Sequence, residues 1–135
     1  QITIGAFVSG MDAGQIYNSW PLMGSSFFPN DNEIMNIFKL SAFSDPSLVQ
    51  FMHRNLAYII LIFYLIVLFK IYKKKLINLY FAINLVGLLL FIQILLGILT
   101  LLYGAQILLA SMHQISSIFL VGSSVYLLYL SSKSN

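Results

Sequence analysis

Three long apolar runs, separated by short polar stretches, set the pattern of this chain. They cover residues 47–69, 76–102 and 107–130. A helix rises about 1.5 Å per residue and the hydrocarbon core of a bilayer is about 30 Å thick, so each run can cross a membrane as a helix. A shorter apolar piece at residues 1–9 is interpreted as the end of a truncated helix. The pattern predicts an all-α integral membrane helix bundle with three complete transmembrane helices and the end of a fourth.

Residues 10–46 are more polar than the runs on either side of them. They contain Trp-Pro and Phe-Phe-Pro sequences and several glycines, which favour an ordered loop over a long helix. Within this loop, Ile34, Ile37 and Phe38 fall on one side of a short helical pattern whose other positions are polar. We therefore expect the loop to carry a short interfacial helix that lies on the membrane surface.

The basic residues give the expected direction of the helices. Four of the seven lysines and arginines lie between Lys70 and Lys75, and Lys133 follows the last apolar run. Cytoplasmic loops carry an excess of basic residues, and two crossings separate these two basic segments, so both are predicted to face the cytoplasm. The C-terminus is then cytoplasmic, and the net negative loop at residues 10–46 lies outside.

Composition narrows the class of protein. Hydrophobic residues make up 59% of the chain and charged residues 8%, whereas roughly a quarter of the residues of a globular domain are charged. The cations cluster at the end of a transmembrane run instead of forming a surface stripe, so no nucleic acid partner is predicted. The chain has no cysteine, which excludes disulfides, thiolate metal sites and cysteine nucleophiles.

No catalytic residue is predicted from the sequence. All four carboxylates lie in the loop at residues 10–46, and none is within a helical turn of a histidine in the sequence. No hydrolase motif or phosphate-binding loop occurs. The composition therefore favours a protein that holds a cofactor.

The two histidines of the chain, His53 and His113, both lie inside apolar runs. They are six and seven residues from the outer ends of helices that run in the same direction, so both lie roughly 9–11 Å below the outer surface. Small residues one turn further on, Ala57 and Ser117, leave room for a flat group between the helices. Imidazole is a common haem ligand. His53 and His113 are therefore predicted to be the two axial ligands of a haem iron.

Two other interpretations of the histidines compete with this one. Each histidine could simply hydrogen-bond a neighbouring helix, although ionisable groups within a membrane are costly and usually functional. Met52 and Met112 precede the histidines and raise the alternative of a copper site. Successive residues on a helix point about 100° apart, so these methionines are expected to face away from the imidazoles.

Arg54 is the only arginine and lies inside the first complete run. Helical side chains lean toward the N-terminus, which is the outer end of this helix. Arg54 is therefore expected to reach outward, either to water or to an anionic group such as a haem propionate. Gln93 on the next helix is expected to form an interhelical hydrogen bond.

Four motifs of the chain, in order, resemble those of haem A synthase. They are Gly5–Gly14 with Tyr17–Met23, Val49–Arg54 with Ala57-Tyr58, Gln93–Leu102, and Ala110–Gln114. The resemblance covers nearly the whole chain. It implies an eight-helix enzyme of the bacterial or mitochondrial inner membrane, built from two similar four-helix halves. This enzyme oxidises a methyl group of haem O to the formyl group of haem A for cytochrome oxidase assembly.

The resemblance also implies specific roles and partners. Residues 1–135 are similar to the C-terminal half of that family, which holds haem b through two histidines that map onto His53 and His113. The N-terminal half, with the substrate haem O and a functional glutamate, would be the principal partner. Nothing here matches that glutamate, since Gln50, three residues before His53, is uncharged. We therefore expect this fragment alone to be inactive.

The sequence leaves further partners and other functions undecided. Membrane lipid and haem O synthase are further candidate partners. The main alternative function is a free-standing bis-histidine b-type membrane cytochrome that carries electrons. A third is an assembly scaffold that keeps its helices only for interactions and binds no haem.

Overall fold

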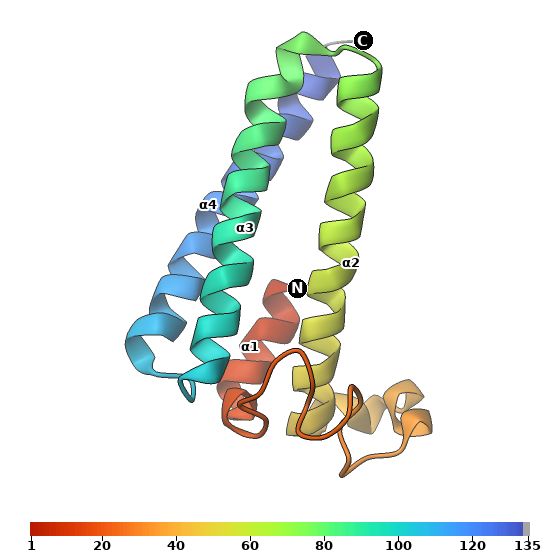
Figure 1. Cartoon of the computed structure of the whole chain (residues 1–135), viewed down its shortest axis with the longest axis vertical. Helices are drawn as coiled ribbons and strands as arrows, with labels where there is room; N and C mark the ends of the chain where they lie inside the picture. Colours follow the sequence, from red (N-terminus) through yellow and green to blue (C-terminus); the bar gives the residue numbers. More distant parts are fainter. Residues whose placement is uncertain (134–135) are drawn as a thin grey trace.

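The computed structural model describes residues 1–133, and this part of the chain is helical with no named β-strand. The prediction of an all-α fold is therefore confirmed. Four α-helices form the bundle, and short 3₁₀ turns (η) lie in the connections (Figure 1). In order, the elements are α1 (Ile2–Gly10), η1 (Ala13–Gln15), η2 (Ile34–Phe38), η3 (Leu40–Ser44), α2 (Pro46–Lys73), η4 (Ile77–Leu79), α3 (Tyr80–Leu102) and α4 (Ile107–Lys133).

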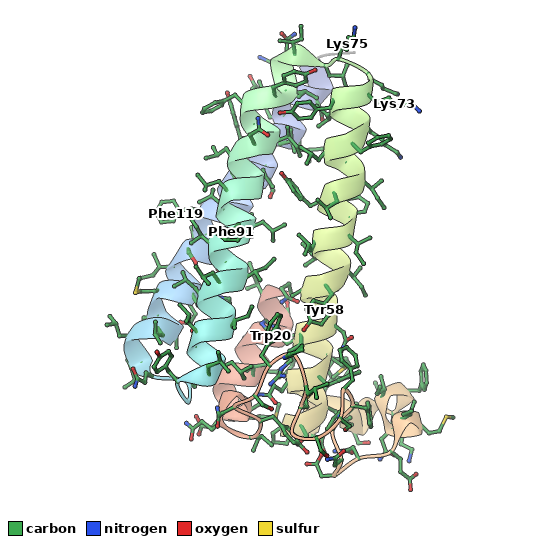
Figure 2. All side chains as sticks on the ribbon, viewed as in Figure 1. Trp20, Tyr58, Lys73, Lys75, Phe91 and Phe119 are labelled. Atoms are coloured by element: carbon green, nitrogen blue, oxygen red, sulfur yellow. The ribbon has the colours of Figure 1, made fainter. Side chains whose placement is uncertain are left out.

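Within residues 1–133, three helical segments are long and apolar enough to cross a membrane. They are Pro46–Lys73, Ile77–Leu102 and Ile107–Lys133, with mean hydropathies of 2.1, 2.8 and 1.5. Their outward faces carry large apolar side chains that no other part of the described chain covers; Phe119 is one that points away from the bundle (Figure 2). Such faces suit contact with lipid, and the prediction of an integral membrane helix bundle is confirmed.

The bundle has two distinct ends. At the loop end lie residues 11–45, here called the long loop, and the short turn between α3 and α4 (Figure 1). At the basic end lie Lys70–Lys75 and Lys133, and Figure 2 shows Lys73 and Lys75 there. A small core of Ile71, Leu79 and Ile83 joins α2 to η4 and α3 at this end.

Helix α2 is longer than the apolar run that predicted it. It begins where Asp45 caps it, accepting a hydrogen bond from the Leu48 amide at 3.0 Å. It continues beyond residue 69 to Lys73, because lysines are good helix formers and their heads can reach water. The helix ends at Lys73, and Lys75, two residues later, has a φ of 53°, the left-handed backbone that commonly follows the C-terminus of a helix.

Helices α3 and α4 pack together as an antiparallel hairpin, while α2 stands beside α3 (Figure 1). Near the basic end, Tyr64 of α2 lies against Gly87 of α3, and a Cβ atom at position 87 would overlap the tyrosine hydroxyl. That hydroxyl donates to the Ile83 carbonyl at 3.4 Å. The missing side chain at Gly87 therefore lets α2 approach α3 at this point.

The predicted short helix of the loop is present as two 3₁₀ turns, η2 and η3. Lys39 between them has an extended backbone, so the two turns do not merge into one α-helix. Their apolar side chains are open, with Phe38 80% and Leu40 89% exposed. This exposure is what a segment that rests on a membrane surface requires.

Candidate functional site

The two histidines of the chain come together although α2 and α4 have little other contact. The ring centroids of His53 and His113 are 6.5 Å apart, and the ring planes are inclined by 77°. Both residues are partly buried in the half of the bundle nearer the long loop. The sequence placed the two imidazoles at one depth, and the structure brings them into the same site.

Two glycines make the space in which these rings lie. A Cβ atom at Gly5 of α1 would lie 3.1 Å from Cε1 of His53, and one at Gly97 of α3 would lie 3.0 Å from Cε1 of His113. These distances are shorter than ordinary van der Waals contact, so any larger side chain would displace the ring. These glycines could not be identified as site residues from the sequence, because a glycine in an apolar run gives no sign of which neighbour approaches it.

Gln93 of α3 holds His113 in place. Its Nε2 donates to the His113 carbonyl at 3.0 Å and lies 3.1 Å from the ring Nδ1. Ser116 donates to Gln93 Oε1, which fixes the orientation of the amide. Gln93 thus forms the predicted interhelical hydrogen bond, and the bond is to the proposed ligand itself.

The ring of His53 makes fewer hydrogen bonds than the ring of His113. Its Nδ1 is buried and has no hydrogen-bond partner among residues 1–133, while its Nε2 lies 3.4 Å from Nε2 of Gln1. Buried polar atoms without a partner are rare, and each one needs an explanation. A ring with one poorly satisfied nitrogen is suited to receive a further ligand or hydrogen bond.

The geometry of the pair fits a haem iron between the rings. A metal–imidazole bond is about 2 Å long and a ring nitrogen lies about 1 Å from the ring centroid, so two axial imidazoles have centroids roughly 6 Å apart. The observed separation is 6.5 Å. Residues 1–133 contain no group of three or more histidine, cysteine or acidic side chains that could hold a bare metal ion. A haem needs no third protein ligand, because its macrocycle supplies the other ligands of the iron.

The position of Met112 does not support a copper site with a sulfur ligand. Met112, beside His113, is 46% exposed, as expected for a residue that points away from its neighbour on the helix. The chain has no cysteine to supply the thiolate of common copper sites. A haem is therefore the metal group that these side chains suit best.

Arg54 binds the long loop from within α2. Its Nη2 donates to the Tyr17 carbonyl at 2.8 Å, and its Nη1 donates to the carbonyls of Ser19 and Leu22 at 2.9 and 3.3 Å. The expected partners of Arg54 were water or a haem propionate, whereas its observed partners are backbone carbonyls of the loop. Nε of Arg54 is buried and has no partner among residues 1–133, so a contact to an anionic group stays a prediction.

Further side chains hold the same part of the loop. Gln50 donates to the Tyr17 carbonyl at 3.1 Å, and the Trp20 indole donates to the Tyr58 hydroxyl at 3.1 Å (Figure 2). Asn18 donates to the Leu101 carbonyl of α3 at 2.9 Å. The loop is therefore fixed to both α2 and α3 at the end of the bundle nearer the histidines.

The carboxylate of Asp31 anchors the loop further out. It accepts hydrogen bonds from Ser47 at 2.6 Å and from the Tyr17 hydroxyl at 3.0 Å. Burial alone would raise the pKa of Asp31, but these donated hydrogen bonds outweigh it and lower the pKa below the ordinary value. Burial raises the pKa of Tyr17, and its bond to Asp31 adds to the increase.

The long loop should therefore become less stable as the pH falls. Because the folded pKa of Asp31 is lowered, its contribution is present above the unfolded value of about 3.9 and is lost as the pH falls through the folded value. We expect fluorescence of Trp20, the only tryptophan, to report loosening of the loop below about pH 4. Asp31→Asn should show a smaller change between pH 5 and pH 3. An identical acid transition in both proteins would assign the effect to other carboxylates.

Comparison with known proteins gives a consistent result. The model of the cytochrome oxidase assembly protein family COX15-CtaA matches residues 1–125. A haem A synthase of Pelagibacter ubique is 46% identical over 132 residues, which cover 98% of this chain and 39% of the relative. A haem A synthase of Rickettsia africae is 39% identical over 133 residues, covering 96% of this chain and 38% of the relative. The chain thus spans less than two fifths of the length of these relatives. No solved structure matches it.

Proposed function

Because this chain belongs to the COX15-CtaA family of cytochrome oxidase assembly proteins, we propose that it is the haem-b-binding C-terminal half of a haem A synthase. The part of its relatives that it matches is their C-terminal portion. The observation that carries the proposal is the meeting of His53 and His113, with centroids 6.5 Å apart, in a bundle that crosses the membrane. The substrate would be haem O, bound by the other half.

The residues of this chain would act mainly by holding and orienting the haem. A haem held by two imidazoles of this chain would supply electron transfer. His53 and His113 would be its ligands, and Gln93 would hold the backbone of His113 in place through its hydrogen bond to the His113 carbonyl. Arg54 and the loop residues it binds would keep water from the site at the loop end.

In this proposal, the groups that accept protons from the substrate lie in the other half of the enzyme. All four carboxylate side chains of this chain lie between Asp12 and Asp45, outside the membrane-spanning helices. The oxidation of a methyl group to a formyl group needs groups that accept protons near that carbon. The fragment is therefore proposed to be inactive by itself and to complete the enzyme when its N-terminal partner is present.

Two measurements test this function. Supplied with haem b, the purified chain should bind one haem and show the absorption and paramagnetic resonance spectra of a low-spin iron. Grafted in place of the matching portion of the Pelagibacter ubique relative, it should restore haem A in a host without a synthase. Failure to bind haem would overturn the proposal. Haem binding without restoration would instead favour the free-standing cytochrome.

The two site glycines offer a more local test. Gly97→Ala should push the His113 ring from its position, because the new Cβ would lie 3.0 Å from Cε1. We expect haem affinity to fall roughly tenfold, which is about 1.4 kcal/mol, and the resonance spectrum to shift. Gly122→Ala is the matched control, since a Cβ at that helical position meets nothing within 4 Å. Equal effects of the two substitutions would show that Gly97 has no special role at the ligand.

A further inference from the structure

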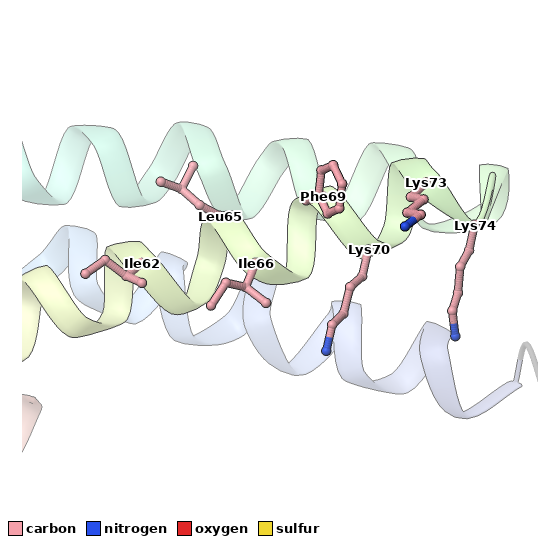
Figure 3. Close-up of a pocket in the computed structure, with 7 residues that line it drawn as sticks. All are labelled: Ile62, Leu65, Ile66, Phe69, Lys70, Lys73 and Lys74. Atoms are coloured by element: carbon pink, nitrogen blue, oxygen red, sulfur yellow. The ribbon is translucent and has the colours of Figure 1, made fainter.

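One face of α2 combines an apolar groove with a row of lysines. The groove is lined by Ile62, Ile66 and Phe69, with Lys70, Lys73 and Lys74 at its end (Figure 3). Positions 62, 66, 70 and 74 follow one another at intervals of four residues, and 69 and 73 lie beside this row, which places all six on one broad face of the helix. Ile62 is 59% and Phe69 65% exposed, so no other described part of the chain covers the groove.

Two of the three lysines extend from this groove in a common direction. Figure 3 shows Lys70 and Lys74, one helical turn apart, pointing the same way with their ammonium groups free of the helix. Lys73 lies over the Phe69 ring, with its Nζ 5.7 Å from the centroid. A phosphate held between Lys70 and Lys74 would be within reach of both heads, because side chains at this spacing are neighbours.

No carboxylate side chain of this chain can neutralise these cations. All four lie between Asp12 and Asp45, at the opposite end of a 28-residue helix that is about 42 Å long. A protein partner seated on the groove would have to bury three lysines or supply its own acids. A lipid with an anionic headgroup needs neither, since it leaves the ammonium groups at the hydrated surface.

Aromatic residues at the same end mark the depth of the membrane surface. Tyr72 of α2 stacks on Tyr80 of α3 with centroids 4.4 Å apart, and Lys133 of α4 lies 4.5 Å over the Tyr129 ring. Tyrosines concentrate at the boundary between hydrocarbon and headgroups. The lysine heads are therefore at headgroup level, while Ile62 and Ile66 are at the level of the acyl chains.

We infer that this groove is a binding site for an anionic phospholipid of the leaflet at the basic end. The phosphate is held between Lys70 and Lys74, and one acyl chain lies along Ile62 and Ile66. The inference does not depend on haem binding, because the groove and the histidines share no residue.

The test compares lipid retention by native mass spectrometry of the purified chain with phosphatidylglycerol and with phosphatidylcholine. The wild-type chain should retain phosphatidylglycerol preferentially. K70Q/K74Q should weaken that retention about thirtyfold, as expected for two basic residues that each contribute about 1 kcal/mol near an anionic headgroup. K70R/K74R should preserve it, which would show that the loss follows charge and not misfolding.

The matched control is K75Q/K133Q, which removes the same charge from the same end without touching the groove. It should change retention less than about twofold, since neither residue lines the site. Equal losses in both double variants would reduce the effect to net charge and overturn the inference. Unchanged lipid retention in K70Q/K74Q would also overturn the inference. If the oligomeric state of that variant changed at the same time, the groove would be identified as a protein interface.

Discussion

Alanine at His53 or at His113 is expected to remove the low-spin haem spectrum of this chain. Each ring would supply one of two axial ligands, and the sequence has no third histidine and no cysteine to replace it. The loss should exceed about a hundredfold in haem affinity for a haem held mainly through its iron, equivalent to about 2.7 kcal/mol. Titration with haem b, followed by absorption and paramagnetic resonance, would measure both the affinity and the spin state.

Leucine at Met52 or Met112 provides the matched control for the histidine variants. These positions adjoin the histidines but point to other sides of their helices, so the spectrum should stay as in the wild type. Helical content by circular dichroism should be similar in all four variants. A chain with both histidines replaced that kept the low-spin spectrum would exclude the proposed ligands.

Arg54→Leu is expected to release the long loop from α2. The substitution removes hydrogen bonds to the carbonyls of Tyr17, Ser19 and Leu22. Hydrogen bonds from a charged donor contribute about 1.5–3 kcal/mol each, and water can replace part of that, so local opening should become easier by about 3 kcal/mol. Fluorescence of Trp20 and the rate of proteolysis in the loop would report the opening.

Two further substitutions separate the roles of Arg54. Arg54→Lys should keep part of the loop attachment, because an ammonium group can reach one or two carbonyls but lacks the planar fork of the guanidinium. Tyr58→Phe removes only the hydrogen bond from Trp20 and should have a smaller effect. If Arg54→Leu left the loop intact but lowered haem retention, the arginine would act on a propionate. A normal loop together with normal haem retention would contradict both roles.

The fold was largely predictable because membrane helices carry a strong signal in sequence. Apolar runs of more than about 20 residues satisfy their backbone in a bilayer as helices, so these segments identified α2, α3 and α4. The exact ends were less predictable. The apolar run ends at Phe69, but α2 continues to Lys73. Lysine does not break a helix, and its long side chain can reach water while its backbone stays helical.

The candidate site was predictable only where residue type carries the chemistry. His53 and His113 could be paired from their depths, since they are the only histidines and both helices run the same way. The hydrogen bonds of Arg54 could not be predicted, because their acceptors are backbone carbonyls that every residue has. Gly5 and Gly97 were missed for a related reason, as their role depends on which ring faces them in the folded chain.

The contact between Tyr64 and Gly87 limits which substitutions this bundle can accept. Since the tyrosine hydroxyl occupies the place of a side chain at position 87, an alanine there requires the Tyr64 side chain to move away or to be replaced by a smaller one. The two positions are therefore expected to change together and not singly. Natural variants that carry a larger residue at 87 should show a compensating loss at 64, so this pair would record in sequence the closest approach of the two helices.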